Sequence, residues 1–233
     1  MIKNGLLVAD KIGYAKFKTH LIPITNKIAR PQYRMFPKYI TIHNTGNSKN
    51  GANAKNHTEY VDKTTDYLSW HFTVDDREIY QELPINETGW HAGDGYGNGN
   101  MLSIGIEICE HEGIDWEKAK YNAIQLIIIL MKDLNIGINN VVPHKHWSGK
   151  YCPRVILNEG WDKFVGLVKK ELELMDKKLT ADEILELGTI DKEKWIRGKL
   201  ALINMAKAEG DLGDLEIFKF LDELVVKIYY LRQ

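Results

Sequence analysis

Hydrophobic and polar residues alternate with a period of two in several segments between Tyr39 and Cys109, and this period is typical of β-strands. The segment YITIH places two isoleucines on one face of a strand and Thr41 and His43 on the other. The segment SIGIEIC likewise places three isoleucines on the face opposite Glu107. We therefore expect strands of a mixed sheet, each with an apolar face for the core and a polar face for chemistry.

A longer apolar repeat with helical spacing follows Asp115, a good N-cap residue, and predicts a helix that is buried against the sheet. Two further helices are expected over about 53–64 and about 161–175, and HFTV and EIYQEL predict a hairpin. The stretch 88–100 contains five glycines and no periodicity, so we expect a loop on the rim of a cleft. The predicted fold class is α/β, with a mixed central β-sheet flanked by helices.

The character of the sequence changes after Met175, where a polar and charged segment precedes a capping box formed by Thr180 and Glu183. Apolar stripes separated by glycines then predict three short helices. We expect two domains, residues 1–175 and a small all-α domain over residues 176–233. About 55 residues bury only a marginal core, so this second domain is expected to dock, to self-associate or to bind a partner.

The composition of the 233 residues is that of a folded globular protein, with 44% hydrophobic and 27% charged residues. The net charge of -1 provides no global positive field, which argues against nucleic acid or an anionic membrane as a partner. The longest mainly apolar run without a charge, residues 122–131, has ten residues, too few for a membrane span. The N-terminal segment has neither an apolar h-region nor a cleavage site, so we expect no signal peptide and synthesis in the cytoplasm.

Three features carry candidate chemistry: His43 at the end of a strand, Glu107 on a strand, and the segment PHKHWSGKYCP, in which His144 and Cys152 are eight residues apart. Imidazole nitrogen and thiolate sulfur are preferred ligands of Zn²⁺, and a catalytic zinc site uses three protein ligands and leaves one position for water. His43, His144 and Cys152 would fill three positions if the chain returned at the Ser-Gly pair between the last two. By chemistry alone, His146 is a rival to His144.

Three other residues, His71, Gly105 and Cys109, are near these features in the sequence and also have structural explanations. His71 follows a tryptophan in a predicted strand and would pack beside the site or ligate the metal. Gly105 lies on the face of Glu107, where a missing side chain leaves room for a ligand or another backbone, although a bulge also explains a glycine in a strand. Cys109 is expected to be a small buried hydrophobe.

The motifs YITIHNTGN, SWHFTVDD, GWHAGDG, SIGIEICE and HKHWSGKYCP together resemble the zinc-dependent N-acetylmuramoyl-L-alanine amidases of the type 2 family, phage endolysins in particular. These enzymes are similar in fold to peptidoglycan recognition proteins. The resemblance runs from about Pro37 to Leu172 and covers nothing of the C-terminal tail. It implies hydrolysis of the amide bond between N-acetylmuramic acid and the L-alanine of the stem peptide.

The resemblance also implies which residues hold the metal. The first zinc ligand is the histidine that ends the first core strand, which is His43. The second is the first histidine of the HKHWSGKYCP segment, which favours His144 over His146, and the third is Cys152. Zn²⁺ is therefore the expected cofactor.

Four further residues take roles from the same resemblance. Glu107 carries over as the general base and Lys150 as the group that stabilises the oxyanion. Some members place a catalytic tyrosine at the position of Trp70, whose indole N–H donates a hydrogen bond but does not exchange a proton. Trp70 is therefore expected to serve at most as a wall of the substrate site or as a hydrogen-bond donor, and His91 to lie along the substrate groove.

The expected partner is bacterial cell-wall peptidoglycan. A lysin without a signal peptide would be made in the host cytoplasm and act on the wall after release, and the helices of residues 176–233 would bind the wall or form a homo-oligomer. Two alternatives remain open: a non-catalytic peptidoglycan-binding module, which in such proteins usually lacks the cysteine ligand, and a cysteine peptidase of cell-wall peptides that uses Cys152 with His144.

Overall fold

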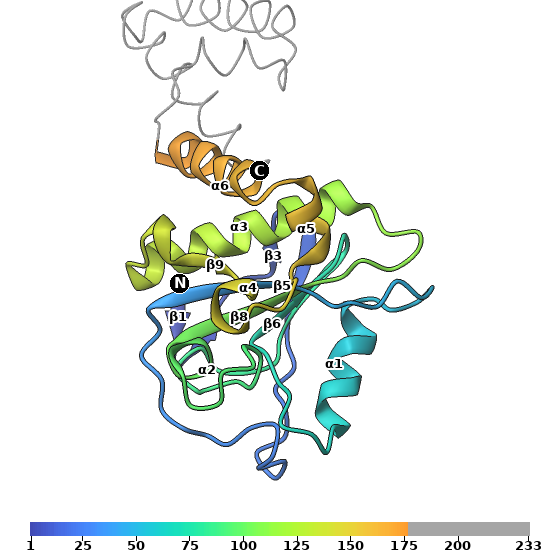
Figure 1. Ribbon diagram of the computed structural model, residues 1–233, viewed down its shortest axis with the longest axis vertical. Coiled ribbons are helices and arrows are strands. Elements are labelled where there is room, and N and C mark those ends of the chain that lie inside the picture. Colours follow the sequence, from blue (N-terminus) through green and yellow to red (C-terminus); the bar gives the residue numbers. More distant parts are fainter. Residues whose placement is uncertain (177–233) are drawn as a thin grey trace, which may run out of the picture. The chain divides into compact units, whose positions relative to one another are not determined.

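The computed structural model describes residues 1–176, and Figure 1 colours them from blue to orange along the chain. Residues 1–172 form one compact unit. The last described helix ends at Asp176. The remainder of the small all-α domain that we expect over 176–233, with its three helices, lies outside the described residues.

A seven-stranded mixed sheet forms the centre of this unit, as the sequence predicts. In spatial order its strands are β3 (Lys11–Ile12), β4 (Ala15–Thr19), β7 (Glu78–Gln81), β6 (Phe72–Val74), β8 (Ser103–Ile108), β5 (Tyr39–Asn44) and β9 (Val141–Pro143). The hairpin of β6 and β7 is antiparallel, whereas β5 runs parallel to both β8 and β9. A separate two-stranded sheet pairs β1 (Ile2–Lys3) with β2 (Leu6–Leu7).

The helices surround this sheet (Figure 1), and the three that the sequence predicts are present. They are α1 (Ala54–Lys63), α3 (Trp116–Leu134) and α6 (Trp161–Asp176), and the short helices are α2 (Asn98–Met101), α4 (Lys145–Ser148) and α5 (Arg154–Glu159). Asp115 caps α3 as expected, because its side chain accepts a hydrogen bond from the backbone N–H of Lys118. None of the helices in the described part of the chain combines the length and the apolar character needed to cross a membrane.

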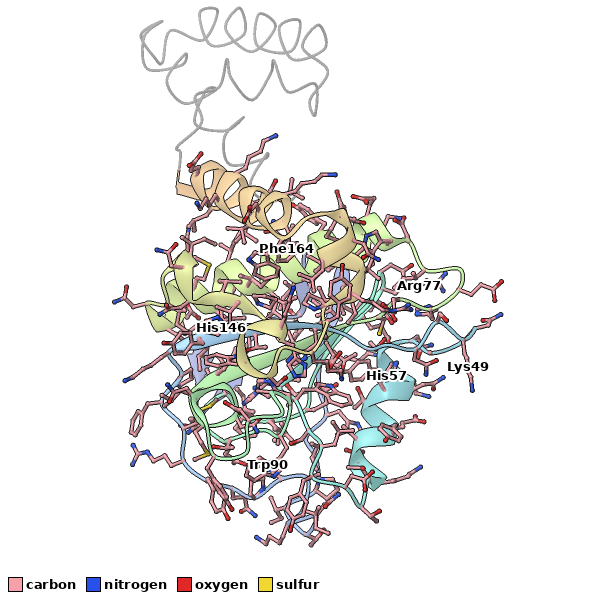
Figure 2. The ribbon with its side chains drawn as sticks, in the orientation of Figure 1. Lys49, His57, Arg77, Trp90, His146 and Phe164 are labelled. Atoms are coloured by element: carbon pink, nitrogen blue, oxygen red, sulfur yellow. The ribbon has the colours of Figure 1, made fainter. Side chains whose placement is uncertain are left out.

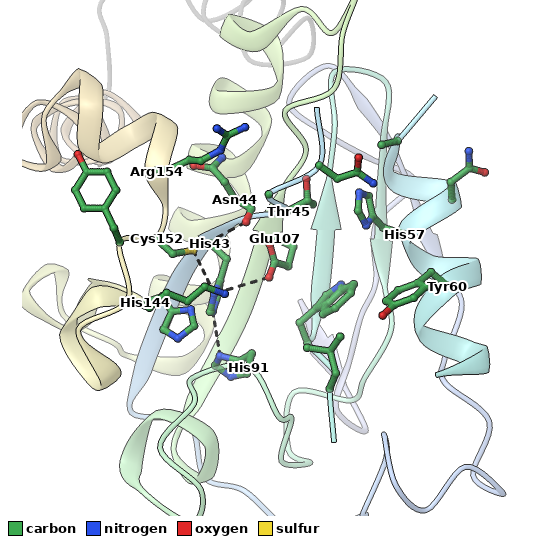
Figure 3. A pocket seen from close by; sticks show the side chains of 18 residues that line it. His43, Asn44, Thr45, His57, Tyr60, His91, Glu107, His144, Cys152 and Arg154 are labelled. Atoms are coloured by element: carbon green, nitrogen blue, oxygen red, sulfur yellow. Dashed lines mark hydrogen bonds and ion pairs between the residues drawn. The ribbon is translucent and has the colours of Figure 1, made fainter. Parts of the chain in front are cut away.

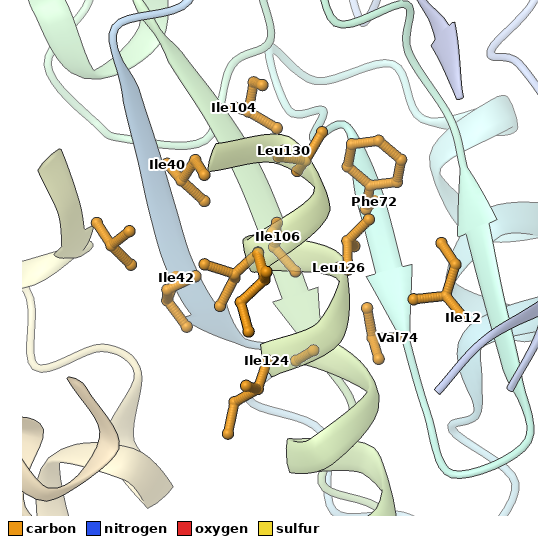
Figure 4. Close-up of a cluster of buried hydrophobic side chains, with 14 of the residues drawn as sticks. Ile12, Ile40, Ile42, Phe72, Val74, Ile104, Ile106, Ile124, Leu126 and Leu130 are labelled. Atoms are coloured by element: carbon orange, nitrogen blue, oxygen red, sulfur yellow. The ribbon is translucent and has the colours of Figure 1, made fainter. Parts of the chain in front are cut away.

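The two faces of the sheet differ because successive side chains of a strand point to opposite sides. The face toward α3 is a buried apolar layer (Figure 4), whose strand residues include Ile40, Ile42, Phe72, Val74, Ile104 and Ile106. On the opposite face, Tyr80 of β7 packs with Ala54 of α1 and with Cys109. His43 and Glu107 alternate with the isoleucines, so they lie on the face that is turned away from α3.

Three strands, β3, β4 and β9, extend the sheet beyond the segment in which we expected it. β4 adds a parallel neighbour to β7 and buries Ala15 and Phe17, and β9 adds a parallel neighbour to β5. β3 and β9 are too short for a period of two to stand out in the sequence, so pairing with distant segments determines them. β4 does alternate, with Ala15 and Phe17 buried and the two lysines between and after them exposed, and the sequence analysis missed this pattern.

Ile106 tests the assigned core, because it is fully buried and is paired in register with Ile42 on β5 and Phe72 on β6. Replacement by alanine should lower the free energy of unfolding by about 2–5 kcal/mol, since it leaves a cavity in a close-packed layer. Ile24, which is 60% exposed, provides the control, and Ile24→Ala should change the free energy by less than about 0.5 kcal/mol. Chemical denaturation followed by circular dichroism measures both variants, and equal losses would contradict the assigned core.

Candidate functional site

Parallel strands bring the first two candidate ligands together. His43 lies near the carboxyl end of β5, and the register of β5 and β8 places it opposite Glu107. β9 runs parallel on the other side of β5 and ends at Pro143, so His144 follows at the same edge of the sheet. The backbone N–H of His144 donates a hydrogen bond to the carbonyl oxygen of Ile42 at 3.1 Å, which fixes its position next to His43.

The third candidate ligand returns to this edge through a tight turn. α4 ends at Gly149 with φ at 75°, a left-handed conformation that glycine adopts readily. The backbone N–H of Lys145 then donates to the carbonyl oxygen of Cys152 at 3.0 Å, which closes the turn. The side chain of Asn44 accepts a hydrogen bond from the backbone N–H of Val155 at 3.0 Å and so ties the segment to β5. The return of the chain at the Ser-Gly pair is therefore confirmed.

The side chains of His43, His144 and Cys152 form a buried cluster at the end of the three strands (Figure 3). Each offers one ligand atom, and these three atoms lie within 4.8 Å of one another. The Sγ atom of Cys152 lies 3.8 Å from Nδ1 of His43. The Oε1 atom of Glu107 lies 3.8 Å from the same nitrogen, so Nδ1 of His43 faces the centre of the cluster.

This cluster fits a zinc ion by its donors and by its unpaired atoms. Two imidazole nitrogens and one sulfur are a common zinc ligand set with an open fourth position. The side chain of His144 is only 5% exposed, yet neither of its ring nitrogens has a hydrogen-bond partner among the described residues. Burial also lowers the pKa of His144, and the positive charge of Lys150 lowers it further. A neutral imidazole with unpaired nitrogens is ready to act as a ligand.

The other histidines near the cluster are placed differently. His146, the rival of His144, is exposed on α4 (Figure 2), where its ring packs against Trp147 with centroids 4.6 Å apart. The ring of His71 is buried, and both of its nitrogens are bonded to the backbone: Nδ1 accepts from Gly105 and Nε2 donates to the carbonyl oxygen of Glu87. His71 therefore packs beside the site with no nitrogen left to bind a metal.

Burial shifts the pKa values of His43 and Cys152 in the directions that disfavour a reactive thiolate. Desolvation lowers the pKa of His43 well below its usual range, with smaller contributions from His91 and His144. Desolvation, assisted by the nearby Glu107, raises the pKa of Cys152 to about 11. A nucleophilic thiolate requires the opposite shifts, because an imidazolium normally stabilises it. Metal coordination, in contrast, deprotonates a thiol directly.

Glu107 is the carboxyl group beside the cluster. Desolvation raises its pKa to about 8, and the positive charge of Lys150 opposes this shift. Its Oε2 atom is buried and has no hydrogen-bond partner within residues 1–176. A divalent cation held by the cluster would lower this pKa, because a nearby positive charge favours the carboxylate. The lysine is exposed and lines the same groove, where its charge also lowers the pKa of His144.

The cluster lies in a groove of about 530 Å³. Trp70, which is 4% exposed, lines this groove, and its indole N–H donates to the hydroxyl of Thr73 at 2.6 Å. That donor is therefore used within the protein, and the ring offers an apolar wall. His91 also lines the groove from the glycine-rich loop, with its ring beside His43.

Helix α1 supplies a part of the groove that the sequence analysis missed. Asn56, His57 and Tyr60 line it from this helix, and Figure 3 shows the last two. Within the described part of the chain, Nε2 of His57 is buried without a hydrogen-bond partner. The sequence predicts the helix itself. The missing information was which of its polar residues face the sheet edge, and that depends on how the helix packs.

The chain is similar in sequence to known proteins. CwlH of Bacillus subtilis (strain 168), an N-acetylmuramoyl-L-alanine amidase, is 56% identical over 149 residues, a match that covers 64% of this chain and 59% of CwlH. XlyA of the same organism, also an N-acetylmuramoyl-L-alanine amidase, is 58% identical over 135 residues, which cover 58% of this chain and 45% of XlyA. The chain thus spans about half of the length of these relatives.

Solved structures share the fold of this part of the chain. The catalytic domain of XlyA superposes with a TM-score of 0.64 at 52% identity, and the match covers 66% of this chain and 99% of that domain. The structure of PlyL gives a TM-score of 0.61 at 40% identity, covering 66% of this chain and 96% of PlyL. The model of the N-acetylmuramoyl-L-alanine amidase family matches residues 33–155, more than half of the sequence. The chain therefore belongs to the N-acetylmuramoyl-L-alanine amidase family.

Proposed function

We propose that this protein is a zinc-dependent peptidoglycan hydrolase that cleaves the amide bond between N-acetylmuramic acid and the L-alanine of the stem peptide. The observation that carries the proposal is the buried cluster of His43, His144 and Cys152 in a groove, with Glu107 beside it. Membership of the amidase family supports the assignment of the bond that is cleaved.

The three residues of the cluster would hold the zinc ion. Zinc bound by such donors lowers the pKa of water to about 7 and polarises a carbonyl oxygen. Within the protein, hydrogen bonds of the backbone fix two of these residues: His144 is bonded to Ile42, and Cys152 is bonded to Lys145. The ligands are thus preorganised by the strand ends and the turn, and little reorganisation is needed when a cation binds.

Glu107 is the general base of the proposed reaction. Its carboxylate would take the proton of the attacking water and pass it to the nitrogen of the leaving amine, so that a single group serves both half-steps. Its unpartnered Oε2 atom is the oxygen that is free to do so. Lys150 would place its ammonium group near the carbonyl oxygen and stabilise the negative charge that develops there.

The substrate would lie along the groove. Trp70 offers an apolar wall for it, and Asn56 and His57 offer polar groups from α1. The contact of His91 with the substrate remains a prediction. Both ring nitrogens of His91 are bonded within the protein, so any such contact would be made by the ring carbons. As a peptidoglycan hydrolase of the endolysin type, the protein would act on the bacterial cell wall after release from the host cytoplasm.

Both alternatives fit the site less well. A peptidase that uses Cys152 with His144 needs the two groups paired, yet the sulfur contacts His43 instead, and burial raises the pKa of the thiol to about 11. A binding module has no need of a buried cysteine beside two histidines, a group that proteins commonly use for zinc. The carboxyl group of Glu107 next to the cluster also favours catalysis over binding alone.

Removal of the metal should abolish activity. We expect about one zinc ion per chain by elemental analysis, loss of cell-wall hydrolysis in a strong chelator, and recovery when zinc is added back. Identification of L-alanine as the newly exposed N-terminal residue on digested walls shows which bond is cleaved. A chain without zinc that retains full activity in chelator would contradict the metal and would support the cysteine peptidase instead.

Glu107→Gln keeps the shape of the side chain but removes its ability to accept a proton. We expect turnover to fall by about 10²- to 10⁴-fold while zinc content is unchanged. Glu59→Gln is the matched control, because Glu59 is exposed on α1 and pairs with Lys55 one turn away, and the turnover of this variant should equal that of the unmodified protein. Turnover of Glu107→Gln close to that of the control would assign Glu107 a structural role.

The proposed catalytic residues all lie within the compact unit of residues 1–172. A chain truncated after residue 176 should therefore still cleave soluble muramoyl peptides with little change in turnover. Loss of hydrolysis of whole walls alone would assign wall binding to residues 177–233. A full-length protein that sediments above the 26.8 kDa of one chain, with a truncated chain that sediments as a monomer, would assign self-association. A folded, zinc-loaded truncation that is inactive on soluble peptides would instead place part of the active site in the tail.

A further inference from the structure

The ring of His91 joins the candidate ligand His43 to the backbone of β8. The Nδ1 atom of His91 lies 3.1 Å from Nε2 of His43, and the Nε2 atom of His91 lies 3.1 Å from the carbonyl oxygen of Ser103 (Figure 3 shows the first contact). His91 is 6% exposed and His43 is 1% exposed, so water does not compete for these contacts. The two rings stand at 89° to each other with centroids 5.1 Å apart.

The carbonyl oxygen of Ser103 determines which ring nitrogens of His91 and His43 carry a hydrogen. A carbonyl oxygen only accepts, so Nε2 of His91 must carry the hydrogen that Ser103 receives. A neutral imidazole carries one N–H, which leaves Nδ1 of His91 as an acceptor. Nε2 of His43 must then carry the donated hydrogen. The Nδ1 atom of His43 is left with its lone pair, facing Cys152 and Glu107.

We propose that His91 is a positioning residue, which through its contact with Ser103 holds His43 in the tautomer whose Nδ1 lone pair is directed at the metal site. This inference rests on the metal-binding part of the proposed function and adds a residue that acts through a ligand. A histidine ligand generally gains affinity when its other nitrogen donates to a fixed acceptor, because the tautomer and the ring plane are then set in advance.

The packing around His91 holds the acceptor in place. Gly105 of β8 leaves the space for its ring, since a Cβ atom there would lie 2.7 Å from Cγ of His91. The room expected at this glycine is thus filled by the imidazole. The side chain of Asn100 accepts hydrogen bonds from the backbone N–H groups of His91 and Ala92, each at 2.8 Å. Both the backbone and the ring of His91 are therefore fixed before any cation binds.

The pKa shifts agree with neutral rings for His91 and His43. Burial, with the neighbouring His71 and His144, lowers the pKa of His91 to about 3, and the contact with Ser103 opposes this only in part. Desolvation also lowers the pKa of His43. Both rings are also buried, which favours the neutral form, and the hydrogens assigned above follow from their contacts.

Nitrogen-15 NMR of the histidine rings tests the tautomer without any variant. In the unmodified, metal-free chain, Nδ1 of His43 should show the chemical shift of an unprotonated ring nitrogen and Nε2 that of an N–H. The His43→Gln variant assigns the signals. A His43 ring that carries its hydrogen on Nδ1, or that exchanges freely between the two tautomers, would overturn the proposal, whether or not the protein is an amidase.

Two variants of His91 separate hydrogen bonding from packing. His91→Leu fills the space beside Gly105 without an acceptor, whereas His91→Asn can place its amide oxygen near the position of Nδ1. Zinc affinity, measured by competition with a chromophoric chelator, should fall by about 10- to 100-fold in His91→Leu. It should recover most of that loss in His91→Asn. The tautomer of His43 should become mixed only in the leucine variant.

Two results would contradict the positioning role of His91. Equal zinc affinity in the unmodified protein and both variants would show that the acceptor is irrelevant to the metal. Equal losses in both variants would assign the effect to packing alone. Circular dichroism of the metal-free variants reports whether the fold is kept, and the measurement on the unmodified chain decides the tautomer if either variant does not fold.

Discussion

The parallel pairing of β5 with β8 determines where the chemistry of this protein lies. Its register sets His43 opposite Glu107 on one face and Ile42 opposite Ile106 on the other. A shift of one residue would turn the imidazole into the apolar layer under α3 and the isoleucines into the groove. The hydrophobic face therefore fixes the position of the polar one. Because β9 joins the same edge in parallel, His144 reaches the site by the same constraint.

Burial gives this edge its chemical character. Desolvation favours the neutral form of each group in the cluster, so it lowers the pKa of His43 and raises the pKa values of Glu107 and Cys152. Without a cation, the site has two neutral imidazoles, a thiol and a carboxyl group with a raised pKa. A divalent ion reverses these preferences for the sulfur and the carboxylate, since both are stabilised by positive charge. The site is thus poised to bind a cation.

The sequence predicts those parts of the fold whose pattern is local. Strands β5 and β8 and helix α3 have periods that can be read without knowing their neighbours, and so the faces of His43 and Glu107 were predicted correctly. The return of Cys152 follows from a turn nearby. The sequence does not reveal which histidine the sulfur contacts, because that depends on how the returning segment is tied to Asn44.

The contact between His91 and His43 was hidden for a similar reason. It joins residues 48 apart in sequence and depends on the space left by Gly105 on a third segment. The short strand β9 and the groove-facing side of α1 could not be predicted either, since pairing and packing between distant segments place them. Local pattern thus predicts elements, and long-range packing completes the site.

X-ray absorption at the zinc edge tests the central claim most directly. In the zinc-loaded protein, we predict one sulfur at about 2.3 Å and two imidazole nitrogens at about 2.0–2.1 Å, with a further light atom in the open position. Cys152→Ser should remove the sulfur signal and leave the histidine signals in place. A spectrum of the unmodified protein with no sulfur, or one with four protein ligands and no open position, would contradict the account.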